Sequence, residues 1–382
     1  MTERAIMLTA GGTGGHIFPA VAVARDLQAR GNAVVFVGAA GGMEQGVAER
    51  ENLTFYGIRA GKLDRGRPSP RALWRAAAGF VDATRLLRRL QPRVVVGFGG
   101  FASFPASAAA ALTGTPLVLH ESNAFPGLVT RLLARRAMAV ALGDEAAGSR
   151  LPGATLAWVG MPVREVRRPR LEALQELGLD AERLTLLVMP GSQGSEVINR
   201  LLPGLLVEAL ANGLANGAPV QVLHATGPGR LDEVAAQVQG LSWYHVAPTV
   251  DGPTAWSAAD VALTRAGSAT VADAAFHGVP LVMTPLPSAA EDHQSMNALA
   301  VVERGAGRLL PQTSLEDRPG EATDIILGCL TRNWIGVASI AASSASPAGA
   351  AGRLCDLILG IAAGQKAQGS ARAKPGVQQE VP

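Results

Sequence analysis

A glycine-rich segment that ends in a histidine is the chemically most distinctive feature of the sequence. Residues 11–16 read GGTGGH, between an apolar run at 5–10 and an alanine-rich stretch with helical periodicity. Glycine lets backbone N–H groups approach a ligand closely, and the first turn of a helix offers unpaired N–H groups and a positive dipole end. The segment therefore predicts an anion-binding loop between a buried strand and a helix. His16 adds a side chain that can accept a proton near pH 7.

Two familiar phosphate-binding signatures do not describe this loop. A dinucleotide G-x-G-x-x-G motif that starts at Gly12 would need a third glycine at Ile17. A P-loop would need Gly-Lys-Ser/Thr, whereas Gly15 is followed by His16. A tight turn that only packs a helix against a strand remains the alternative interpretation.

Two further segments repeat the order of strand, small-residue turn and helix. Residues 190–195 follow the apolar run 184–189 and precede a helical pattern from Glu196. Residues 261–273 place Asp273 near the first turns of another helix. A carboxylate there suits a ribose diol, while an acid that only complements the helix dipole is the alternative.

The elements that must position these loops alternate between strands and helices. Apolar runs predict strands at 5–8, 33–37, 93–96, 116–119, 137–141, 184–189, 220–224, 243–246, 261–263 and 281–284. This alternation predicts an α/β fold of two doubly wound, Rossmann-like domains with parallel sheets. Ligands of such sheets bind at the carboxyl ends of the strands, so we expect a cleft where the two sheets face each other.

Proline and glycine punctuation suggests where the domains begin and end. The segment 158–164 contains the expected junction, which predicts domains at 1–160 and 161–340. We expect a helix at 341–363 that packs back toward the first domain. The stretch 364–382 has no apolar periodicity and is predicted to be a mobile tail.

The basic charge is concentrated in the first part of the chain. Residues 1–165 contain 19 Lys and Arg against 11 Asp and Glu, a net charge of +8, whereas the remainder carries −5. The asymmetry indicates an anionic partner, either nucleic acid or a membrane surface. Residues 62–93 contain nine basic and two acidic side chains, with apolar ones at helical spacing. They predict either a membrane-binding helix or a helix that buries its apolar stripe against a sheet. The candidate membrane residues are Arg71, Leu73, Trp74, Arg75 and Phe80.

Cysteine usage and the apolar segments bound the compartment. Cys329 and Cys355 are the two cysteines, which indicates a reducing environment rather than a disulfide framework. Residues 1–4 lead straight into the first strand, so we expect no signal peptide. The most apolar stretch, 105–119, is interrupted by Gly114 and Pro116 and does not predict a membrane span.

Seven ordered motifs resemble those of the MurG family of peptidoglycan N-acetylglucosaminyltransferases. They are GGTGGH at 11–16, GFGGF at 97–101, LHESN at 119–123, VGMPVR at 159–164, GSQG at 191–194, RAGS at 265–268 and HQSMNA at 293–298. Their order over roughly residues 5–310 makes the resemblance specific. It implies a GT-B fold and transfer of GlcNAc from UDP-GlcNAc to lipid I, undecaprenyl-pyrophosphoryl-MurNAc-pentapeptide, which yields lipid II.

The resemblance also implies where the enzyme works and with what. The acceptor belongs on the first domain and the nucleotide sugar on the second. The enzyme is expected at the cytoplasmic face of the cell membrane as a peripheral protein, because the lipid tail of the acceptor stays in an anionic leaflet. It implies no cofactor and no nucleic-acid partner, and it makes cell-wall synthesis proteins candidate partners.

For the donor, the resemblance implies residues in both domains. They are Thr13, Gly14, Gly15, His16, Asn123, Arg164, Ser192, Gln193, Gly194, Thr249, Ala266, Gly267, Ser268, Asp273, His293 and Gln294. Ser192 to Gly194 would receive the diphosphate, Asp273 the ribose, and His293 with Gln294 the sugar hydroxyls. The chain departs from the family pattern at Met161, Ser288 and Asp273, and at 248–251, where the uracil contact is expected.

For the acceptor, the resemblance implies that two glycine loops hold the pyrophosphate. The residues are Gly12, Gly99, Gly100, Phe101, Ser103 and Asn123. Inverting transfer needs one base for the attacking hydroxyl, with His16 as the first candidate and Glu121 as the second. A structural His16, or a Glu121 that only orients His16, are the alternatives. The chain has no Asp-x-Asp pair, so backbone dipoles and cations are expected to meet the charge of the departing UDP, and no metal is implied.

Two other functions remain open at this point. A UDP-GlcNAc 2-epimerase has the same fold and explains the C-terminal half, but not the acceptor-type loops at 97–101 and 120–123. A non-catalytic UDP-sugar-binding protein would not need both His16 and Glu121.

Overall fold

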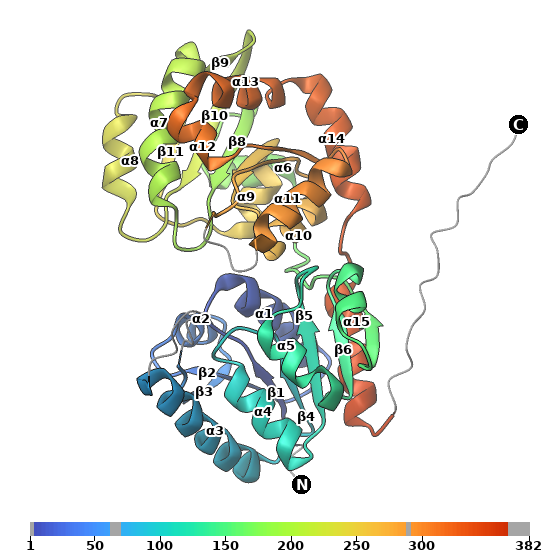
Figure 1. Ribbon diagram of the computed structural model, residues 1–382. Helices are drawn as coiled ribbons and strands as arrows, with labels where there is room; N and C mark the ends of the chain where they lie inside the picture. The colour runs from blue at the N-terminus through green and yellow to red at the C-terminus, as the bar shows by residue number, and fades with distance from the viewer. Residues whose placement is uncertain (1–3, 62–69, 288–291, 366–382) are drawn as a thin grey trace, which may run out of the picture. The chain divides into compact units, whose positions relative to one another are not determined.

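The computed structural model describes every residue except 1–3, 62–69, 288–291 and 366–382 (Figure 1). The described chain forms two compact units. One unit runs up to Ser122, from Pro126 to Gly160 and from Gly352 onward, and the other contains Asn123–Phe125 and Met161–Ala351.

The first unit is built on a seven-stranded parallel sheet. Its order is β3-β2-β1-β4-β5-β6-β7, with the strands β1 Ile6–Thr9, β2 Val34–Ala39, β3 Thr54–Ile58, β4 Val94–Gly97, β5 Leu117–Glu121, β6 Ala139–Leu142 and β7 Leu156–Trp158. Ile6 and Leu8 face one hydrophobic core and Met7 faces the other. Because both faces of the sheet are covered, its central strands are continuous apolar runs.

Helices cover the two faces of this sheet. One core is formed with α1 Gly14–Ala29, α2 Met43–Arg50 and α15 Ala350–Ala362. The opposite core is formed with α3 Pro70–Leu90, α4 Phe104–Thr113 and α5 Leu128–Leu133. The loops that leave the carboxyl ends of β1, β2, β4 and β5 are each followed by a packed helix, which holds the loop in place.

The second unit repeats this plan. Its parallel strands follow the order β11-β10-β8-β12-β13-β14: β8 Leu184–Met189, β10 Ala218–Ala225, β11 Tyr244–Ala247, β12 Val261–Thr264, β13 Leu281–Met283 and β14 Gly307–Leu309, with β9 Leu214–Ala215 antiparallel to β10. One core includes α7 Glu196–Ala209, α8 Leu231–Gln237, α12 Gln312–Asp317 and α13 Pro319–Cys329. The other includes α6 Arg170–Glu176, α9 Gly252–Ala258, α10 Ser268–His277, α11 His293–Glu303 and part of α14 Arg332–Ser344.

The predicted α/β class with two doubly wound parallel sheets is confirmed. Strands β3, β7, β9 and β14 were not predicted. β3 lies at a sheet edge and is mostly exposed or half-buried, so it lacks the continuous apolar run of the central strands. β14 has only three residues, which is too short for a periodicity to appear.

The end of the chain differs from the single helix expected at 341–363. α14 ends at Ser344 and α15 begins at Ala350, because Pro347 cannot continue a helix. α15 buries Leu354 and Ile358 in the core of the first unit. Gly364 adopts a φ of +83°, and its N–H and that of Gln365 donate to the last turn of α15. The first two residues of the predicted tail therefore cap α15, and residues 366–382 lie outside the described residues.

Among the residues that the structure describes, no single helix is long and apolar enough to span a membrane. α13 and α14 together meet the criteria of length and composition, but they are bent by 77° relative to each other. Both contribute buried residues to the second unit.

Candidate active site

Two glycine loops of the first unit meet at the carboxyl ends of β1 and β4. Gly100 adopts a φ of +79°, and a Cβ added to it would overlap the carbonyl oxygen of Gly11. A Cβ on Gly12 would lie 2.9 Å from the ring of Phe101. Only glycine allows backbones to approach this closely. The structure thus brings the predicted acceptor residues Gly12, Gly99, Gly100 and Phe101 into one cluster.

His16 lies between these two loops, in the first turn of α1. Its half-buried imidazole packs on the second loop: a Cβ on Gly99 would lie 3.2 Å from His16 Nδ1, and one on Gly100 would lie 3.1 Å from His16 Cδ2. Thr13 begins α1, and its carbonyl accepts the N–H of His16 at 3.2 Å. The first amides of α1 have no acceptor within the helix, which leaves them available to an anion.

A buried histidine that sequence reasoning had given no role lies beside this cluster. Burial lowers the pKa of His120 to about 4, so its imidazole is neutral. Its Nε2 lies 3.3 Å from the Gly160 carbonyl oxygen, which can only accept, so Nε2 carries the proton. Nδ1 then accepts from the Ser122 hydroxyl at 3.4 Å. His120 anchors the end of β5 and cannot serve as a base, because burial keeps it from becoming protonated.

Glu121 occupies a supporting position next to His120. Its side chain is buried, and one carboxylate oxygen accepts the N–H of Gly127 at 2.9 Å. Gly127 begins α5, so the carboxylate ties the end of β5 to the loop that contains Asn123. This geometry favours the interpretation of Glu121 as an organiser of the loop.

Two buried polar side chains support the glycine loops from below. Ser103 is fully buried and donates its hydroxyl to the Gly100 carbonyl at 3.0 Å, so it shapes the predicted acceptor loop from beneath. Glu44 is buried below Gly11 and accepts the N–H of Ala39 at 2.8 Å. Sequence reasoning missed Glu44, although an acid in the first turn of a helix that follows Gly41-Gly42 was a usable signal.

The second unit contains the other predicted anion-binding loop, between β8 and α7. Gly194 adopts a φ of +72°, and a Cβ on it would overlap the Thr226 carbonyl oxygen. A Cβ on Gly227 would lie 2.5 Å from the backbone nitrogen of Gly194. This close packing leaves the predicted donor residues Ser192 and Gln193 exposed at the loop.

The start of α10 carries the predicted ribose contact. Gly267 begins α10 without a side-chain cap, and Ala266 accepts from the Asn297 side chain at 3.0 Å. Asp273 lies on the same helix as Ser268, and burial raises the pKa of the Asp273 carboxyl to about 7. Perturbed pKa values of this kind are typical of binding sites.

Four other predicted donor residues lie in the second unit, and hydrogen-bond or ion-pair partners define the positions of two of them, Arg164 and Gln294. Arg164 forms an exposed ion pair with Asp251 at 3.2 Å. The Gln294 side-chain oxygen accepts the N–H of Leu286 at 2.9 Å, which leaves its amide N–H groups as donors. Thr249 borders a cavity of about 420 Å³ that is also lined by Leu177, His245 and Asp251, among others. His293 is half-buried at the start of α11.

Two remaining questions concern a possible metal site and the positions at which the chain departs from the family pattern. No cluster of three or more His, Cys, Asp and Glu side chains is placed to hold a metal ion in the described part of the chain. Met161 is buried in a small apolar cluster with Phe276. Ser288 lies outside the described residues.

Helix α3 divides its apolar residues between the core and the surface. Ala83, Leu86 and Leu87 are buried against the sheet, and Phe80, a predicted membrane residue, packs against the same core. Trp74 is 61% exposed, with the Arg59 guanidinium 5.6 Å from its ring centre. The side chains of Arg71 and Leu73 lie outside the described residues.

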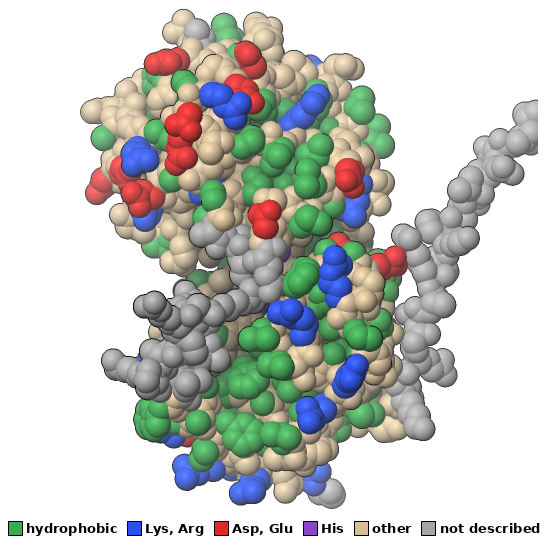
Figure 2. All heavy atoms as spheres, in the orientation of Figure 1, with side chains coloured by type: hydrophobic (Ala, Val, Ile, Leu, Met, Phe, Trp, Pro, Cys, Tyr) green, Lys and Arg blue, Asp and Glu red, His purple; other side chains and the backbone are tan. Residues whose placement is uncertain are grey.

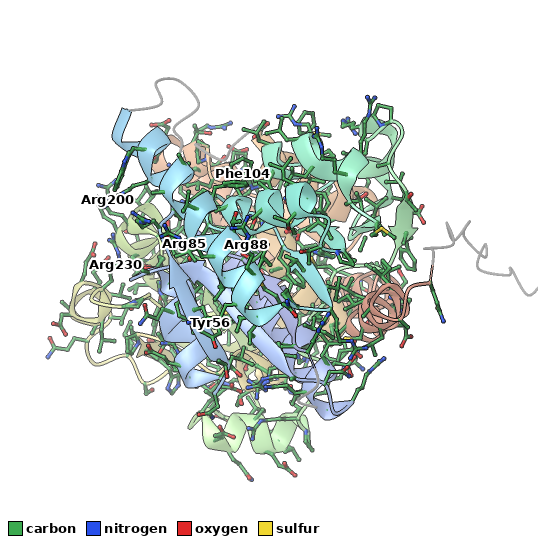
Figure 3. All side chains as sticks on the ribbon, turned by 90° about the horizontal axis from the view of Figure 1, so that it is seen from below. Tyr56, Arg85, Arg88, Phe104, Arg200 and Arg230 are labelled. Atoms are coloured by element: carbon green, nitrogen blue, oxygen red, sulfur yellow. The ribbon has the colours of Figure 1, made fainter. Side chains whose placement is uncertain are left out.

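The solvent face of α3 is mixed aromatic, apolar and basic. Trp74, Val81, Arg85 and Arg88 are all exposed and recur at seven, eleven and fourteen residues, one face of a helix. We call these four residues the α3 face. Figure 3 shows Arg85 and Arg88 on this helix. Figure 2 shows hydrophobic side chains gathered over this side of the first unit, with Lys and Arg around them.

The chain is similar to glycosyltransferases over nearly its whole length. The model for the glycosyltransferase family 28 N-terminal domain matches residues 6–142, and the model for the C-terminal domain of that family matches residues 185–322. A relative from Deinococcus radiodurans is 48% identical over 92% of this chain and 94% of its own length, and one from Thermus thermophilus is 42% identical over 92% and 98%. Both are named UDP-N-acetylglucosamine--N-acetylmuramyl-(pentapeptide) pyrophosphoryl-undecaprenol N-acetylglucosamine transferase.

A solved structure agrees with these relatives. The crystal structure of Acinetobacter baumannii MurG superposes with a TM-score of 0.73 at 28% identity and covers 94% of this chain and 99% of that one. The chain belongs to the MurG family of glycosyltransferases. The predicted resemblance and the GT-B class are thereby confirmed. A putative UDP-N-acetylglucosamine 2-epimerase from Listeria monocytogenes shares only the fold, with a TM-score of 0.65 at 15% identity, so the epimerase alternative is not favoured.

Each of the two glycine-loop clusters lies within one of the two matched family domains. The cluster around His16 lies within the part matched by the N-terminal domain model, and the loop at Ser192 lies within the part matched by the C-terminal one. Each of the two matched domains of this chain therefore contains one of the predicted anion-binding loops.

Proposed function

We propose that this MurG-family protein transfers GlcNAc from UDP-GlcNAc to the MurNAc of lipid I and so produces lipid II. The observation that carries the proposal is the arrangement of His16 between two glycine loops, with a second anion-binding loop at the start of α7. A relative named for that activity is 48% identical over 92% of the chain, which supports the assignment. Lipid I and UDP-GlcNAc each carry a pyrophosphate, which explains why two such loops are needed.

On the acceptor side, backbone amides around Gly12 and Gly100 hold the pyrophosphate of lipid I. The MurNAc hydroxyl attacks the anomeric carbon of GlcNAc as the bond from that carbon to the UDP oxygen breaks, which inverts the configuration. His16 takes the hydroxyl proton, and UDP leaves with the electron pair of the broken bond. Glu121, tied to Gly127, holds the loop that carries Asn123.

On the donor side, the turn at Ser192 to Gly194 and the first amides of α7 receive the departing diphosphate. Arg164 leaves its exposed partner Asp251 to reach the same charge. Asp273 accepts hydrogen bonds from the ribose. His293 and the amide N–H groups of Gln294 select the sugar hydroxyls.

The test of this function is direct conversion of lipid I. The full chain is incubated in detergent with UDP-GlcNAc and lipid I, and the lipid product is identified by mass spectrometry. We expect lipid II and UDP in equal amounts. Release of an epimerised sugar from UDP-GlcNAc alone, or binding of UDP-GlcNAc with no product, would contradict the proposal.

We further propose that the protein attaches peripherally to the cytoplasmic face of the cell membrane through the α3 face. Its guanidinium groups attract anionic headgroups, and Trp74 buries apolar surface at the interface. This attachment also accounts for the net charge of +8 on residues 1–165 better than nucleic acid does.

Trp74→Ala is expected to weaken binding to anionic vesicles roughly ten- to a hundredfold, because burial of a large side chain contributes roughly 1.5–3 kcal/mol. The measurement is co-sedimentation with phosphatidylglycerol vesicles at low and high salt. Trp158→Ala is the matched control, since Trp158 is also exposed, at 41%, but lies on β7. Equal binding to neutral vesicles at both salt concentrations would contradict the proposal.

Donor binding is expected to depend on pH because of the ionisation of the Asp273 carboxyl. Burial raises its pKa to about 7, so the carboxyl is ionised above pH 7 and protonated below it. Since the ionised form accepts from both ribose hydroxyls, the UDP affinity should rise as the pH increases through 7. We expect a Kd about tenfold larger at pH 6 than at pH 8.5, measured by calorimetry. Asp273→Asn should bind weakly at both values.

The same carboxyl is expected to lower the stability of the folded chain as the pH rises, whereas it raises the UDP affinity. Its folded-state pKa of about 7 lies above the ordinary value of 3.8, so the folded chain binds more protons between these values. Stability therefore falls as the pH rises through this window, by at most about 4 kcal/mol from this group. Asp273→Asn should raise the Tm at pH 8 and leave it unchanged at pH 4. An Asn variant that is less stable than the parent at pH 8 would contradict the assignment.

A further inference from the structure

We propose that Ser195 is a further donor-binding residue, whose hydroxyl donates a hydrogen bond to the diphosphate and is oriented for this by the buried Arg265. The inference rests on the proposed function and names one more contact of the same site. Sequence reasoning had placed Ser195 at the end of the predicted phosphate loop 190–195 and had quoted Arg265 within a motif, but it had given neither side chain a role of its own.

The hydrogen bonds that Ser195 Oγ accepts restrict the direction in which its hydroxyl hydrogen can point. Ser195 is the N-cap residue immediately before α7. It is 8% exposed, and its Oγ accepts the N–H of Ile198 at 3.4 Å. The same Oγ accepts from Arg265 Nη2 at 2.8 Å. A hydroxyl oxygen has two lone pairs and one hydrogen, so both acceptor positions are filled. The hydrogen must point in the remaining direction, and the hydrogen bonds of the described residues include no acceptor for it.

Arg265 is itself held rigidly at the end of β12. Its side chain is 9% exposed, and its guanidinium donates to the carbonyl oxygens of Thr284 and Pro285 at 3.0 and 3.1 Å and to Gln312 Oε1 at 3.0 Å. Together with the bond to Ser195, these contacts give each of the two terminal nitrogens, Nη1 and Nη2, two acceptors. A positive charge thus lies directly behind the first turn of α7, where it strengthens the attraction for an anion.

The contacts of Arg265 also reach the other half of the donor site. The segment that it holds at Thr284 and Pro285 continues to Leu286, whose N–H donates to Gln294. Arg265 therefore links the diphosphate loop to the helix start that is proposed to select the sugar. It acts as a positioning residue, and Ser195 is the group that touches the ligand.

The first experiment compares UDP with uridine for Ser195→Ala. We expect the Kd of UDP to rise about tenfold, as loss of one hydrogen bond to a charged group does, while the Kd of uridine stays unchanged. Calorimetry provides both values. Ser314→Ala is the matched control, because Ser314 is also buried and accepts from an arginine, Arg318, but lies at α12. It should change neither value.

The second experiment asks whether Arg265 acts through Ser195. Arg265→Met should raise the Kd of UDP by more than Ser195→Ala does, and Arg265→Lys should restore part of the loss. In the Ser195→Ala background, Arg265→Met should have a clearly smaller effect than in the parent chain. Arg183→Met is the control. Arg183 also donates to two backbone carbonyls, but it precedes β8 and so lies at the amino ends of the parallel strands, whereas Arg265 follows the carboxyl end of β12.

The outcomes separate this inference from the proposed function. If the parent chain binds no UDP, the proposed function falls and this inference falls with it. If the parent binds UDP but Ser195→Ala leaves the ratio of the UDP and uridine Kd values unchanged, only this inference is overturned. Strictly additive effects of the two substitutions would overturn the role of Arg265.

Discussion

His16→Ala is expected to lower kcat for GlcNAc transfer by about a thousandfold, because general bases contribute roughly 10²–10⁴ to a rate. The Kd of UDP should change little, since the diphosphate is proposed to lie on the second unit. The measurement is lipid II formation at saturating UDP-GlcNAc, together with calorimetry for UDP. The imidazole packs on Gly99 and Gly100, so its removal leaves space without displacing the backbone.

Glu121→Gln decides between the two candidate bases. The glutamine oxygen can still accept from the Gly127 N–H, so a carboxylate that only organises its loop should be replaced with a loss of less than about tenfold. A carboxylate that removes the proton would instead lose as much as His16→Ala. If His16→Ala keeps more than a tenth of the activity while Glu121→Gln loses a thousandfold, the roles proposed here are reversed.

Gly194→Ala should abolish tight donor binding, with a rise in the Kd of UDP of about a hundredfold. The added Cβ would overlap the Thr226 carbonyl oxygen, so the loop at Ser192 and Gln193 must move. A displacement of about 1 Å in a positioned site costs on the order of a hundredfold. The φ of +72° adds strain, because a side chain disfavours this conformation.

Gly229→Ala separates the two causes. Gly229 has a φ of +74°, but a Cβ on it would meet nothing within 4 Å. This variant therefore carries the backbone strain without the overlap, and we expect a lower Tm with the Kd of UDP unchanged. Normal UDP binding by Gly194→Ala would refute the proposal that the close approach of Gly194 to Thr226 shapes the donor site.

The central strands could be predicted from the sequence, and the edges could not. β1, β2 and β8 are buried on both faces, so each appears as an unbroken apolar run that few other structures tolerate. β3 and β14 lack that run, because an edge strand is half solvated or very short. The interruption between α14 and α15 was signalled by Pro347, but the alanine-rich sequence on both sides favoured one continuous helix.

Some features of the candidate site could likewise be predicted from the sequence and others could not. Glycine and histidine in one motif indicated anion binding and proton transfer, because those functions depend on residue type and local backbone freedom. The motif did not reveal that Ser103 faces the underside of its loop, or that His120 is buried and neutral. Likewise, periodicity placed Phe80 and Trp74 on one helix, but only the packing of α3 showed that Phe80 lies against the core and Trp74 in solvent.

The sequence by itself determined the α/β class with its two parallel sheets, the positions of the glycine loops and the family, because each rests on residue type and short spacing along the chain. Only the tertiary structure decided which polar groups are exposed at these loops and which are buried and support the backbone. That distinction depends on burial and on partners distant in sequence, such as Gly100 against Gly11 and Arg265 against Ser195. Such contacts form when the strands take their order in the sheet, and this order cannot be predicted from residue spacing within one segment.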